Sequence, residues 1–450
     1  MSAAPTLAAR AVSIESRARE VCALMKLSNI KHKSEQVSFR EAVLQGLGRD
    51  QGLFFPQSFE TLDDVHGLLQ ESFVPRSVAV LKHLVGDEIE EATLQAMVSA
   101  AFDFPLEVPA LDDHVRALEL FHGPSLAFKD FGARFMARCL AEFHDGGPMT
   151  ILTATSGDTG AAVAHAYYGQ AGIDVVILYP KGKISPLQEK LFCTLGGNVR
   201  TIAVDSDFDT CQQLVKQSFE DPDLKQGLGL NSANSINMAR LMAQVCYYFE
   251  AGAAVSDPER MVLSVPSGNF GNVTAGLIAR RIGLPYKRII AATNVNDTVP
   301  RFLASGHWDP NPTVTTITNA MDISLPNNFP RVLEMDKHHG LPLMDLLTST
   351  SLDDEETRGA IRSLYRRGYL ADPHSALAWQ ALDRSLEDDE EGVFLCTAHP
   401  AKFLEVMEET LDIDLPLPAE LEAVKDLELL SGLIPGDFSS LKNDLLAGKS

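Results

Sequence analysis

The chain has 450 residues, of which 45% are hydrophobic and 22% are charged, the usual mixture of a globular protein with a large core. At about 150 residues per domain, this length favours two to three domains and excludes disorder over most of the chain. Its 38 basic and 61 acidic residues give a formal net charge of −23. Such a field repels phosphate backbones and anionic lipids, which argues against binding to nucleic acids or membrane surfaces.

The N-terminal residues and the cysteines indicate an intracellular protein. Residues 1–24 hold three arginines and two glutamates, without a secretory apolar region and cleavage site, so we interpret them as an extension ahead of Met25. No apolar run reaches the roughly 18 residues of a membrane span. The six cysteines are scattered without a Cys-x-x-Cys pair, which favours reduced thiols in the cytoplasm over disulfides or a zinc site.

After an N-terminal region of short helices and turns (26–111), the pattern alternates between strands and helices. Apolar runs predict buried strands at 149–154, 175–179, 261–265, 288–292 and 393–396. Helical patterns occur at 160–168, 210–219, 236–250 and 273–282. This alternation indicates an α/β fold, with mostly parallel strands and helices on both faces. The acidic stretch 387–391 is expected to be a solvated loop.

Two strand-to-helix loops are candidate anion sites. They are 155–160 (Thr-Ser-Gly-Asp-Thr-Gly) and 267–271 (Ser-Gly-Asn-Phe-Gly). Each places free backbone N–H groups at a helix N-terminus, where an anion is favoured. For either loop alone, a tight turn with a good helix cap is an equally good explanation. Together they favour one ligand with two anionic ends or two adjacent ligands, and neither matches a Walker or dinucleotide motif.

Lys129 is the candidate nucleophile. It lies among Leu126, Phe128 and Phe131, and apolar surroundings would desolvate its ammonium and ease deprotonation. Spacing alone favours a simpler alternative, in which Lys129 is a helix lysine paired with Asp130 at the surface. A phosphate-bearing aldehyde cofactor, bound at one anion loop and bonded to the lysine, would use both features.

Three further polar features carry weaker signals. Thr397 follows the predicted strand 393–396, although most threonines at such places are helix caps. Within 372–375 an aspartate and a proline predict a helix start, and we interpret His374 as structural. Glu334 and His338 are four residues apart without a third ligand nearby, so no metal site is predicted.

Taken together, these segments closely resemble the threonine synthases, a family of pyridoxal-phosphate enzymes with the tryptophan-synthase-β-like fold (fold type II). The resemblance runs from about residue 26 to at least residue 403. The motifs that carry it, in the order of the family, are 51–56, 121–131, 153–160, 267–271, 292–297, 319–323, 328–331 and 397–403. It implies two mostly parallel-sheet α/β domains plus a small N-terminal domain.

The resemblance also implies a division of the chain into five parts. They are an N-terminal extension (1–24), an N-terminal domain (25–112), a large cofactor-binding domain (113–145 and 206–425), a small nested domain (146–205) and a C-terminal segment (426–450).

The resemblance assigns the cofactor site residue by residue. Lys129 matches the lysine that forms the internal aldimine with pyridoxal 5'-phosphate and moves protons. Thr397 matches the neutral partner of the pyridine nitrogen, and Asp158 lies near the cofactor's 3-oxygen, where many relatives of this fold have asparagine. The residues that match the cofactor's phosphate loop are Gly268, Asn269, Phe270 and Gly271, followed by Asn272 where aspartate is common.

Other residues are implied for the substrate. The expected contacts of its α-carboxylate are Ser125, which stands where threonine is usual, Thr155, Ser156, Gly157 and Thr159. For the departing phosphate we expect basic groups such as Lys183 and Arg240, although both have the alternative of being ordinary surface charges.

The implied activity is that of a carbon–oxygen lyase acting in the last step of threonine biosynthesis. It converts O-phospho-L-homoserine and water to L-threonine and phosphate, in the cytoplasm, as a monomer or homodimer and without nucleic-acid or membrane partners. Two alternatives stay open at this point. One is a phospholyase or dehydratase that yields a keto acid. The other is a non-catalytic phosphosugar-binding regulator, which leaves Lys129 unexplained.

Overall fold

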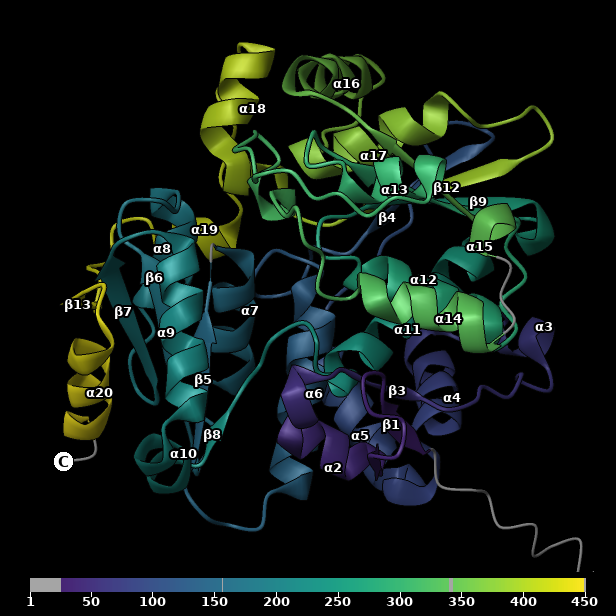
Figure 1. Cartoon of the computed structure of the whole chain (residues 1–450). Coiled ribbons are helices and arrows are strands. Elements are labelled where there is room, and N and C mark those ends of the chain that lie inside the picture. Colours follow the sequence, from purple (N-terminus) through teal and green to yellow (C-terminus); the bar gives the residue numbers. More distant parts are fainter. Residues whose placement is uncertain (1–25, 156, 340–342, 449–450) are drawn as a thin grey trace, which may run out of the picture.

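The computed structural model describes residues 26–155, 157–339 and 343–448. It contains two parallel five-stranded sheets with flanking helices and a smaller N-terminal region (Figure 1). The N-terminal region has a small antiparallel sheet, ordered β2-β1-β3, with four helices around it. Its elements are β1 (Leu27–Asn29), β2 (Gln36–Val37), α2 (Phe39–Gln45), β3 (Phe54–Pro56), α3 (Val65–Leu68), α4 (Phe73–Val85) and α5 (Glu91–Ala101).

The larger α/β unit is built on a parallel sheet ordered β11-β10-β9-β12-β4. Its strands are β4 (Val115–Glu119), β9 (Met261–Pro266), β10 (Arg288–Thr293), β11 (Leu347–Ser351) and β12 (Glu391–Cys396). Figure 1 shows α16 (Asp354–Arg366) and α17 (Pro373–Asp383) above this sheet, and α11 (Met238–Ala254) and α12 (Gly271–Arg281) below it. Because both faces are covered, β9 is buried along its whole length.

The second parallel sheet has the order β13-β7-β6-β5-β8. Its strands are β5 (Met149–Ala154), β6 (Ile173–Pro180), β7 (Val199–Asp205), β8 (Leu230–Asn231) and β13 (Gly432–Pro435). The sheet therefore extends beyond 146–205 and includes strands from both later parts of the chain. Leu214 of α9 (Phe208–Glu220) and Leu441 of α20 (Phe438–Ala447) belong to one apolar cluster on this sheet.

All five predicted strands and all four predicted helices are present in the structure, and the predicted α/β fold class is confirmed. The remaining helices are α6 (Lys129–Phe143), α7 (Asp158–Tyr167), α8 (Pro186–Cys193), α10 (Pro222–Leu228), α13 (Thr298–Ser305), α14 (Phe329–His339), α15 (Leu343–Leu346), α18 (Leu404–Leu411) and α19 (Ala419–Glu422). None of the helices in the described ranges is long and apolar enough to cross a membrane.

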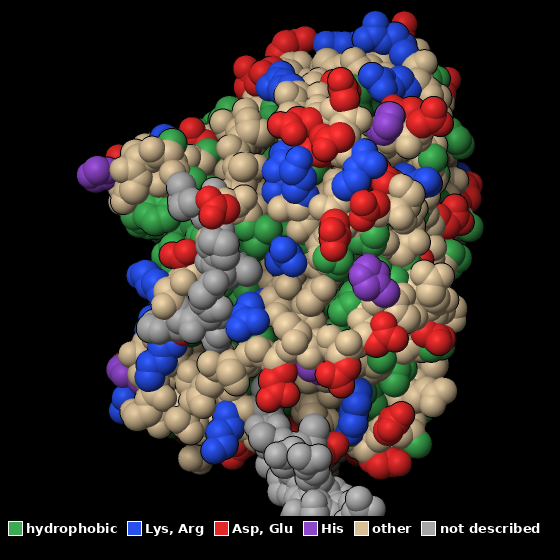
Figure 2. Space-filling view, turned by 90° about the vertical axis from the view of Figure 1, so that its right-hand side faces the viewer, with side chains coloured by type: hydrophobic (Ala, Val, Ile, Leu, Met, Phe, Trp, Pro, Cys, Tyr) green, Lys and Arg blue, Asp and Glu red, His purple; other side chains and the backbone are tan. Residues whose placement is uncertain are grey.

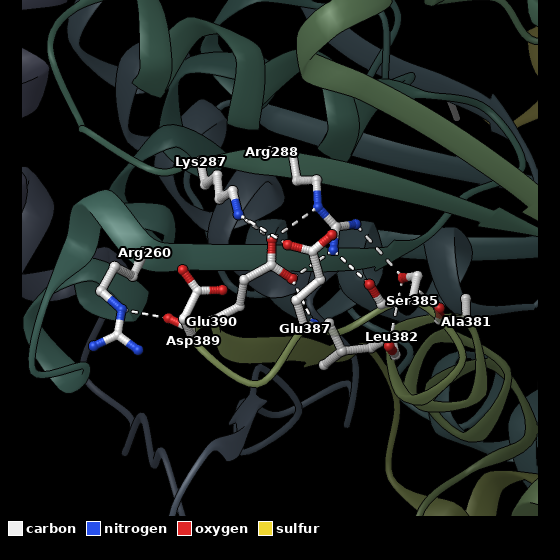
Figure 3. A network of polar contacts seen from close by, with 9 residues as sticks. All are labelled: Arg260, Lys287, Arg288, Ala381, Leu382, Ser385, Glu387, Asp389 and Glu390. Carbon is white, nitrogen blue, oxygen red and sulfur yellow. Dashed lines mark hydrogen bonds and ion pairs between the residues drawn. The ribbon is translucent and has the colours of Figure 1, made fainter.

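The acidic stretch 387–391 is solvated as predicted over 387–389, but Glu390 and Glu391 are buried. The side chain of Glu390 is 1% exposed and lies 2.9 Å from Nζ of Lys287 and 2.6 Å from Nη2 of Arg288 (Figure 3). Burial raises the pKa of Glu390, but the hydrogen bond from Arg288 and its other partners leave it below the ordinary value. Two cations from the start of β10 thus neutralise a charge that the sequence pattern assigned to water.

The surface charges are mixed despite the net charge of −23. Figure 2 shows acidic and basic side chains interspersed over one face of the molecule. A local group of cations can therefore attract an anionic ligand even though the whole chain is acidic.

Candidate active site

The candidate lysine is fixed at the junction of two chain segments. Lys129 is the first residue of α6, and Leu126 before it has φ +56°, a left-handed conformation that is unfavourable for a branched residue. The backbone N–H of Phe128 donates to the carbonyl oxygen of Thr397 at 2.9 Å. That of His399 donates to the carbonyl oxygen of Leu126 at 3.0 Å. These bonds hold the start of α6 against the end of β12.

The surroundings of Lys129 make its amine easier to deprotonate. The side chain is partly buried, and Nζ lies 5.9 Å from the ring centroid of Phe128. Burial lowers the pKa of Lys129 to about 8, against the opposing charge of Asp158 and with further lowering by Arg240 and Lys402. The predicted desolvation of this lysine therefore agrees with the structure.

Asp130 is not the surface partner of Lys129 that the simpler alternative requires. It is fully buried, and its Oδ2 accepts the backbone N–H of Ser125 at 2.9 Å. Burial raises the pKa of Asp130 to about 6. The Ser125 Oγ is also buried and has no hydrogen-bond partner among the described residues. A hydroxyl in this state is available to a ligand.

Asp158 and Lys402 form a buried ion pair between the two sheets. Asp158 begins α7 after β5, and its Oδ1 lies 2.5 Å from Nζ of Lys402, whose side chain is 0% exposed. The same ammonium donates to the carbonyl oxygen of Ser125 at 2.7 Å. Burial alone would raise the pKa of Asp158, but the charges of Lys402 and Lys129 lower it to about 2. Asp158 is therefore a carboxylate throughout the neutral pH range.

The loop 267–271 brings backbone close to a second loop and leaves a helix end open. A Cβ on Gly268 would lie 2.6 Å from the Cα of Met321, so this approach requires glycine. Phe270, with φ +59°, precedes α12 at Gly271 and offers the helix no side-chain cap, while Oδ1 of Asn272 accepts the backbone N–H of Val273 at 2.9 Å. The N–H groups ahead of Val273 are therefore the ones that can receive an anion.

The two asparagines of this segment have structural contacts. Asn269 donates from Nδ2 to Oγ of Ser235 at 2.8 Å and accepts the backbone N–H of Asn327 at 2.6 Å. Asn272 donates from Nδ2 to the carbonyl oxygen of Pro266 at 3.0 Å. Both side chains thus hold the loop in shape.

The loop 155–160 has a similar construction. Thr155 Oγ1 accepts the backbone N–H of Gly157 at 3.0 Å and that of Gly160 at 2.8 Å. Gly157 has φ +144°, a conformation that favours glycine, and it offers no side-chain cap to α7, so Thr155 is the residue whose hydroxyl takes up the N–H of Gly160 in the first turn. Thr159 is partly buried in the first turn of α7, and the predicted Ser156 lies outside the described residues.

The two predicted phosphate-binding cations lie in different environments. Lys183 is exposed on the loop between β6 and α8. Arg240 is 1% exposed in α11, and its Nη1 donates to the carbonyl oxygen of Ala233 at 2.6 Å. Its Nε has no partner among the residues that the structure describes, and burial lowers its pKa to about 10. The interpretation of a surface charge therefore does not apply to Arg240.

Thr397 is supported by the start of α17. Its backbone N–H donates to Oγ of Ser375 at 3.2 Å, and Asp372 caps α17 ahead of a proline, as predicted. Nδ1 of His374 lies 2.7 Å from Oδ1 of Asp372. Its Nε2 is buried without a partner in the described part of the chain. This unpartnered ring nitrogen and the hydrogen bond between Ser375 and Thr397 place the start of α17 at the polar centre of the site.

Three family profiles match consecutive parts of the chain. The profile described as "Pyridoxal-phosphate dependent enzyme" matches residues 106–398. The profiles "Threonine synthase N terminus" and "Threonine synthase, C-terminal" match residues 28–102 and 375–443. The threonine synthase of Haemophilus influenzae is 58% identical over 424 residues, which cover 94% of this chain and 100% of that protein. The chain belongs to the threonine synthase family.

Solved structures of threonine synthases have the same fold. The crystal structure of the Escherichia coli threonine synthase superposes with a TM-score of 0.90 at 55% identity, covering 94% of this chain and 100% of that one. The pyridoxal-phosphate-bound threonine synthase of Brucella melitensis gives a TM-score of 0.88 at 34% identity, with 94% and 98% covered. This member of the threonine synthase family is therefore a fold type II lyase that depends on pyridoxal 5'-phosphate.

The site of this threonine synthase family member fits that cofactor. Its aldehyde requires an amine that deprotonates easily, which Lys129 provides. Its phosphate requires an open helix N-terminus, which α12 provides after Gly268. The partnerless hydroxyl of Ser125 provides a further donor or acceptor. The sequence made Lys129 and the loop around Gly268 candidates, and the family resemblance implied Ser125 as a substrate contact, but neither gave a role to Lys402 or to the unpaired ring nitrogen of His374.

A buried polar network holds the segment 316–322, whose Met321 lies next to Gly268. Nδ2 of Asn294 donates to Oγ1 of Thr318 at 3.0 Å and to Oδ1 of Asp322 at 2.9 Å. Oδ2 of Asp322 accepts the backbone N–H of Thr316 at 3.0 Å. Burial raises the pKa of Asp322 to about 6. This network holds the segment that contains Met321, which is the residue that Gly268 approaches.

One group of side chains in the described ranges has the composition of a metal site. It consists of Glu107, Glu119 and His122. Within it, Oε2 of Glu119 lies 2.7 Å from Nε2 of His122, and the hydroxyl of Tyr369 donates to Oε1 at 2.8 Å. These hydrogen bonds account for the arrangement. The side chain of His338, which the sequence analysis considered with Glu334, lies outside the described part.

Proposed function

We propose that Lys129 is the catalytic residue of a reaction that converts O-phospho-L-homoserine and water to L-threonine and phosphate. The observation that carries this proposal is an amine with a pKa lowered to about 8, at the junction of α6 and β12 and under the charge of Asp158. At pH 7 roughly a tenth of such an amine is unprotonated, compared with less than about 0.1% of an ordinary lysine. It can therefore attack an aldehyde and then accept and return protons.

The proposed cofactor contacts follow from the loop ends. When bound, pyridoxal phosphate supplies an electron sink for the negative charge that develops on the substrate carbon. The segment from Gly268 to Gly271, with the open end of α12, would hold the cofactor phosphate. Thr397 would face the pyridine nitrogen as a neutral partner, and Asp158 would lie near the 3-oxygen. Asn269 and Asn272 support this cradle through the hydrogen bonds described above.

The proposed substrate contacts come from the loop before Lys129 and from the loop 155–159. The residues that would hold the α-carboxylate are Ser125, Thr155, Ser156, Gly157 and Thr159. The buried Oγ of Ser125 and the position of residues 155–159 at the N-terminus of α7 support this assignment. For the departing phosphate we propose Lys183 and Arg240. The partnerless Nε of Arg240 supports its inclusion.

Lys129 would carry the protons of this reaction. Its amine would remove a proton from the substrate's Cα and then one from Cβ, and the γ-phosphate would leave. A proton would then be delivered to Cγ, which becomes the methyl group of threonine. Water would add at Cβ and give up a proton, which leaves with the phosphate, and Lys129 would return a proton to Cα before threonine is released. Cations at the phosphate end lower the cost of the leaving charge in a chain whose overall field is negative.

We also propose that the protein acts on this small molecule in the cytoplasm, as a monomer or homodimer and without nucleic-acid partners. Five of its cysteines are free and buried, which supports a reducing compartment. The net charge of −23 supports the absence of nucleic-acid binding.

The first experiment incubates the purified protein and pyridoxal phosphate with O-phospho-L-homoserine and quantifies phosphate and threonine together. We expect equal amounts of both products. Phosphate with a keto acid and little threonine would instead indicate a phospholyase, and no phosphate would contradict the substrate. The variant Lys129→Ala should keep its fold by circular dichroism and lose the visible absorption of the bound cofactor. An unchanged visible spectrum would refute the assignment of Lys129.

A further inference from the structure

Lys402 is a buried cation near the proposed site that has no role in the proposed chemistry. It lies in the turn Pro400–Phe403, and its side chain is 0% exposed. Taking an ammonium out of water is costly unless it is paired and hydrogen-bonded. Lys402 meets both conditions, through Asp158 at 2.5 Å and the carbonyl oxygen of Ser125 at 2.7 Å.

We infer that Lys402 is a positioning residue of the active site, whose ammonium holds the Asp158 carboxylate in place and balances its charge against Lys129. This inference rests on the proposed function, because it needs Lys129 to be the reacting amine. It also explains how a carboxylate can lie near the anionic 3-oxygen of the cofactor. With Lys402 beside it, Asp158 brings no net negative charge to that position.

The ion pair joins the two α/β units at the site. Asp158 follows β5, in the sheet β13-β7-β6-β5-β8, whereas Lys402 follows β12, in the sheet β11-β10-β9-β12-β4. The carbonyl oxygen of Ser125, the second acceptor of Lys402, belongs to the loop before Lys129. The ammonium of Lys402 therefore contacts both Asp158, which is proposed to lie near the cofactor, and Ser125, which is a proposed substrate contact.

The charges around both groups determine the effect of removing Lys402. Asp158 is under the charges of Lys402, Lys129 of α6 and His374 of α17, and Nε2 of Gln188 in α8 lies 3.5 Å from it. Lys129 is under the negative charge of Asp158 and the positive charges of Lys402 and Arg240 in α11. Without Lys402, Asp158 has Lys129 as its main cationic partner. The proton on Lys129 would then be held more tightly.

The test measures the pH dependence of cofactor uptake by the apoprotein. Pyridoxal phosphate is added, and the initial rate at which the visible band appears is recorded from pH 6 to 10. Because only the unprotonated amine attacks the aldehyde, the midpoint of this profile reports the pKa of Lys129. This readout is independent of turnover. The variants are Lys402→Met, Asp158→Asn, the double variant, and the surface control Lys216→Met, which removes the same charge from an exposed position of α9.

We expect opposite shifts for the two single variants. Removing the cation should raise the midpoint by about one pH unit, and removing the carboxylate should lower it by a similar amount. The double variant and Lys216→Met should stay close to the wild type. Shifts in the same direction, or no shift in either single variant, would overturn the inference.

Two outcomes separate the inference from its premise. If the wild-type protein forms no visible band, the proposed function fails. If the band forms but the midpoints do not separate, only the role of Lys402 fails. Should Lys402→Met not fold, as judged by circular dichroism, Asp158→Asn and the double variant still decide the matter, because both lack Asp158 and their difference is the effect of the Lys402 charge on Lys129: the midpoint of the double variant should lie above that of Asp158→Asn, and equal midpoints would overturn the inference.

Discussion

The backbone N–H of Phe128 donates to the carbonyl oxygen of Thr397 at 2.9 Å. This single bond joins the residue before the proposed reacting amine to the residue proposed to face the pyridine ring. Because both groups belong to the main chain, the distance between the two sides of the cofactor site does not depend on the side chain of Thr397. The role of its hydroxyl can therefore be tested separately from its position.

The variant Thr397→Val keeps the backbone bond and the side-chain shape but removes the hydroxyl. We expect it to retain the visible band of the bound cofactor, while kcat falls by about tenfold or more because the electronic tuning of the ring changes. Steady-state kinetics and the visible spectrum check this. Thr93→Val, in α5, is the matched control and should change neither quantity. Unaltered kcat in Thr397→Val would remove this threonine from the mechanism.

Gly268 offers a test of the phosphate loop by a change of one methyl group. In Gly268→Ala the new Cβ would lie 2.6 Å from the Cα of Met321, so one of the two backbones must move. We expect a loss of about 1–3 kcal/mol in unfolding free energy and weaker cofactor binding. In Gly359→Ala, within α16, nothing lies within 4 Å of the new Cβ, and a gain of up to about 1 kcal/mol follows from helix propensity. Urea unfolding and cofactor titration measure both.

Arg331 ties the N-terminal region to the larger unit. It is 0% exposed, and its Nη2 donates to the carbonyl oxygens of Phe54 at 2.9 Å and Ile236 at 2.7 Å. Arg331→Leu leaves both carbonyls without this donor, so we expect a loss of about 3 kcal/mol or more. The control Arg362→Leu breaks an exposed ion pair with Glu355 and should cost less than about 1 kcal/mol. Similar urea midpoints for the two variants would contradict this view.

Asp322 should give the apoprotein a measurable pH dependence of stability. Its pKa in the folded state is raised to about 6 from 3.8, so the folded state holds the proton where the unfolded state has lost it. Its contribution is therefore present below about pH 4 and is lost as the pH rises towards and through 6. Relative to Asp322→Asn, the wild type should lose about 1 kcal/mol over this range, after solvent screening is allowed for. If the unfolding free energy of the wild type instead rose with pH relative to that of Asp322→Asn, the sign would be opposite and this assignment would be rejected.

Strands that are buried along their whole length could be predicted from the sequence, whereas half-buried edge strands and very short strands could not. Strand β9 is buried along its whole length, so its sequence Met261–Pro266 is nearly all apolar and was predicted. Strand β11 contains Leu-Thr-Ser-Thr-Ser and is largely half-buried at the sheet edge, and it was missed. The strands of the N-terminal sheet have two or three residues, which is too short for any period to appear.

The site was predictable where its chemistry is local in sequence. Glycines before a helix made the loop around Gly268 a candidate, and apolar neighbours together with the two loops made Lys129 one. The partner of Asp158 could not be found in this way, because Lys402 is far away in the sequence, in the turn after β12, and its ion pair is visible only in three dimensions. Glu390 failed for the same reason, since its counterions at Lys287 and Arg288 come from a distant strand.

The position of β13 has a consequence for synthesis of the chain. This strand pairs in parallel with β7, and α20 after it packs on the same sheet as α9. On the ribosome, β7 is made long before β13, and four of the five strands of the sheet β11-β10-β9-β12-β4 are made in between. During that interval β7 is an open sheet edge, with unpaired main-chain donors and acceptors that invite pairing with other chains. In a nascent chain, or in a chain truncated before β13, the edge strand β7 is therefore the place where we expect wrong pairing with other chains or binding to a chaperone.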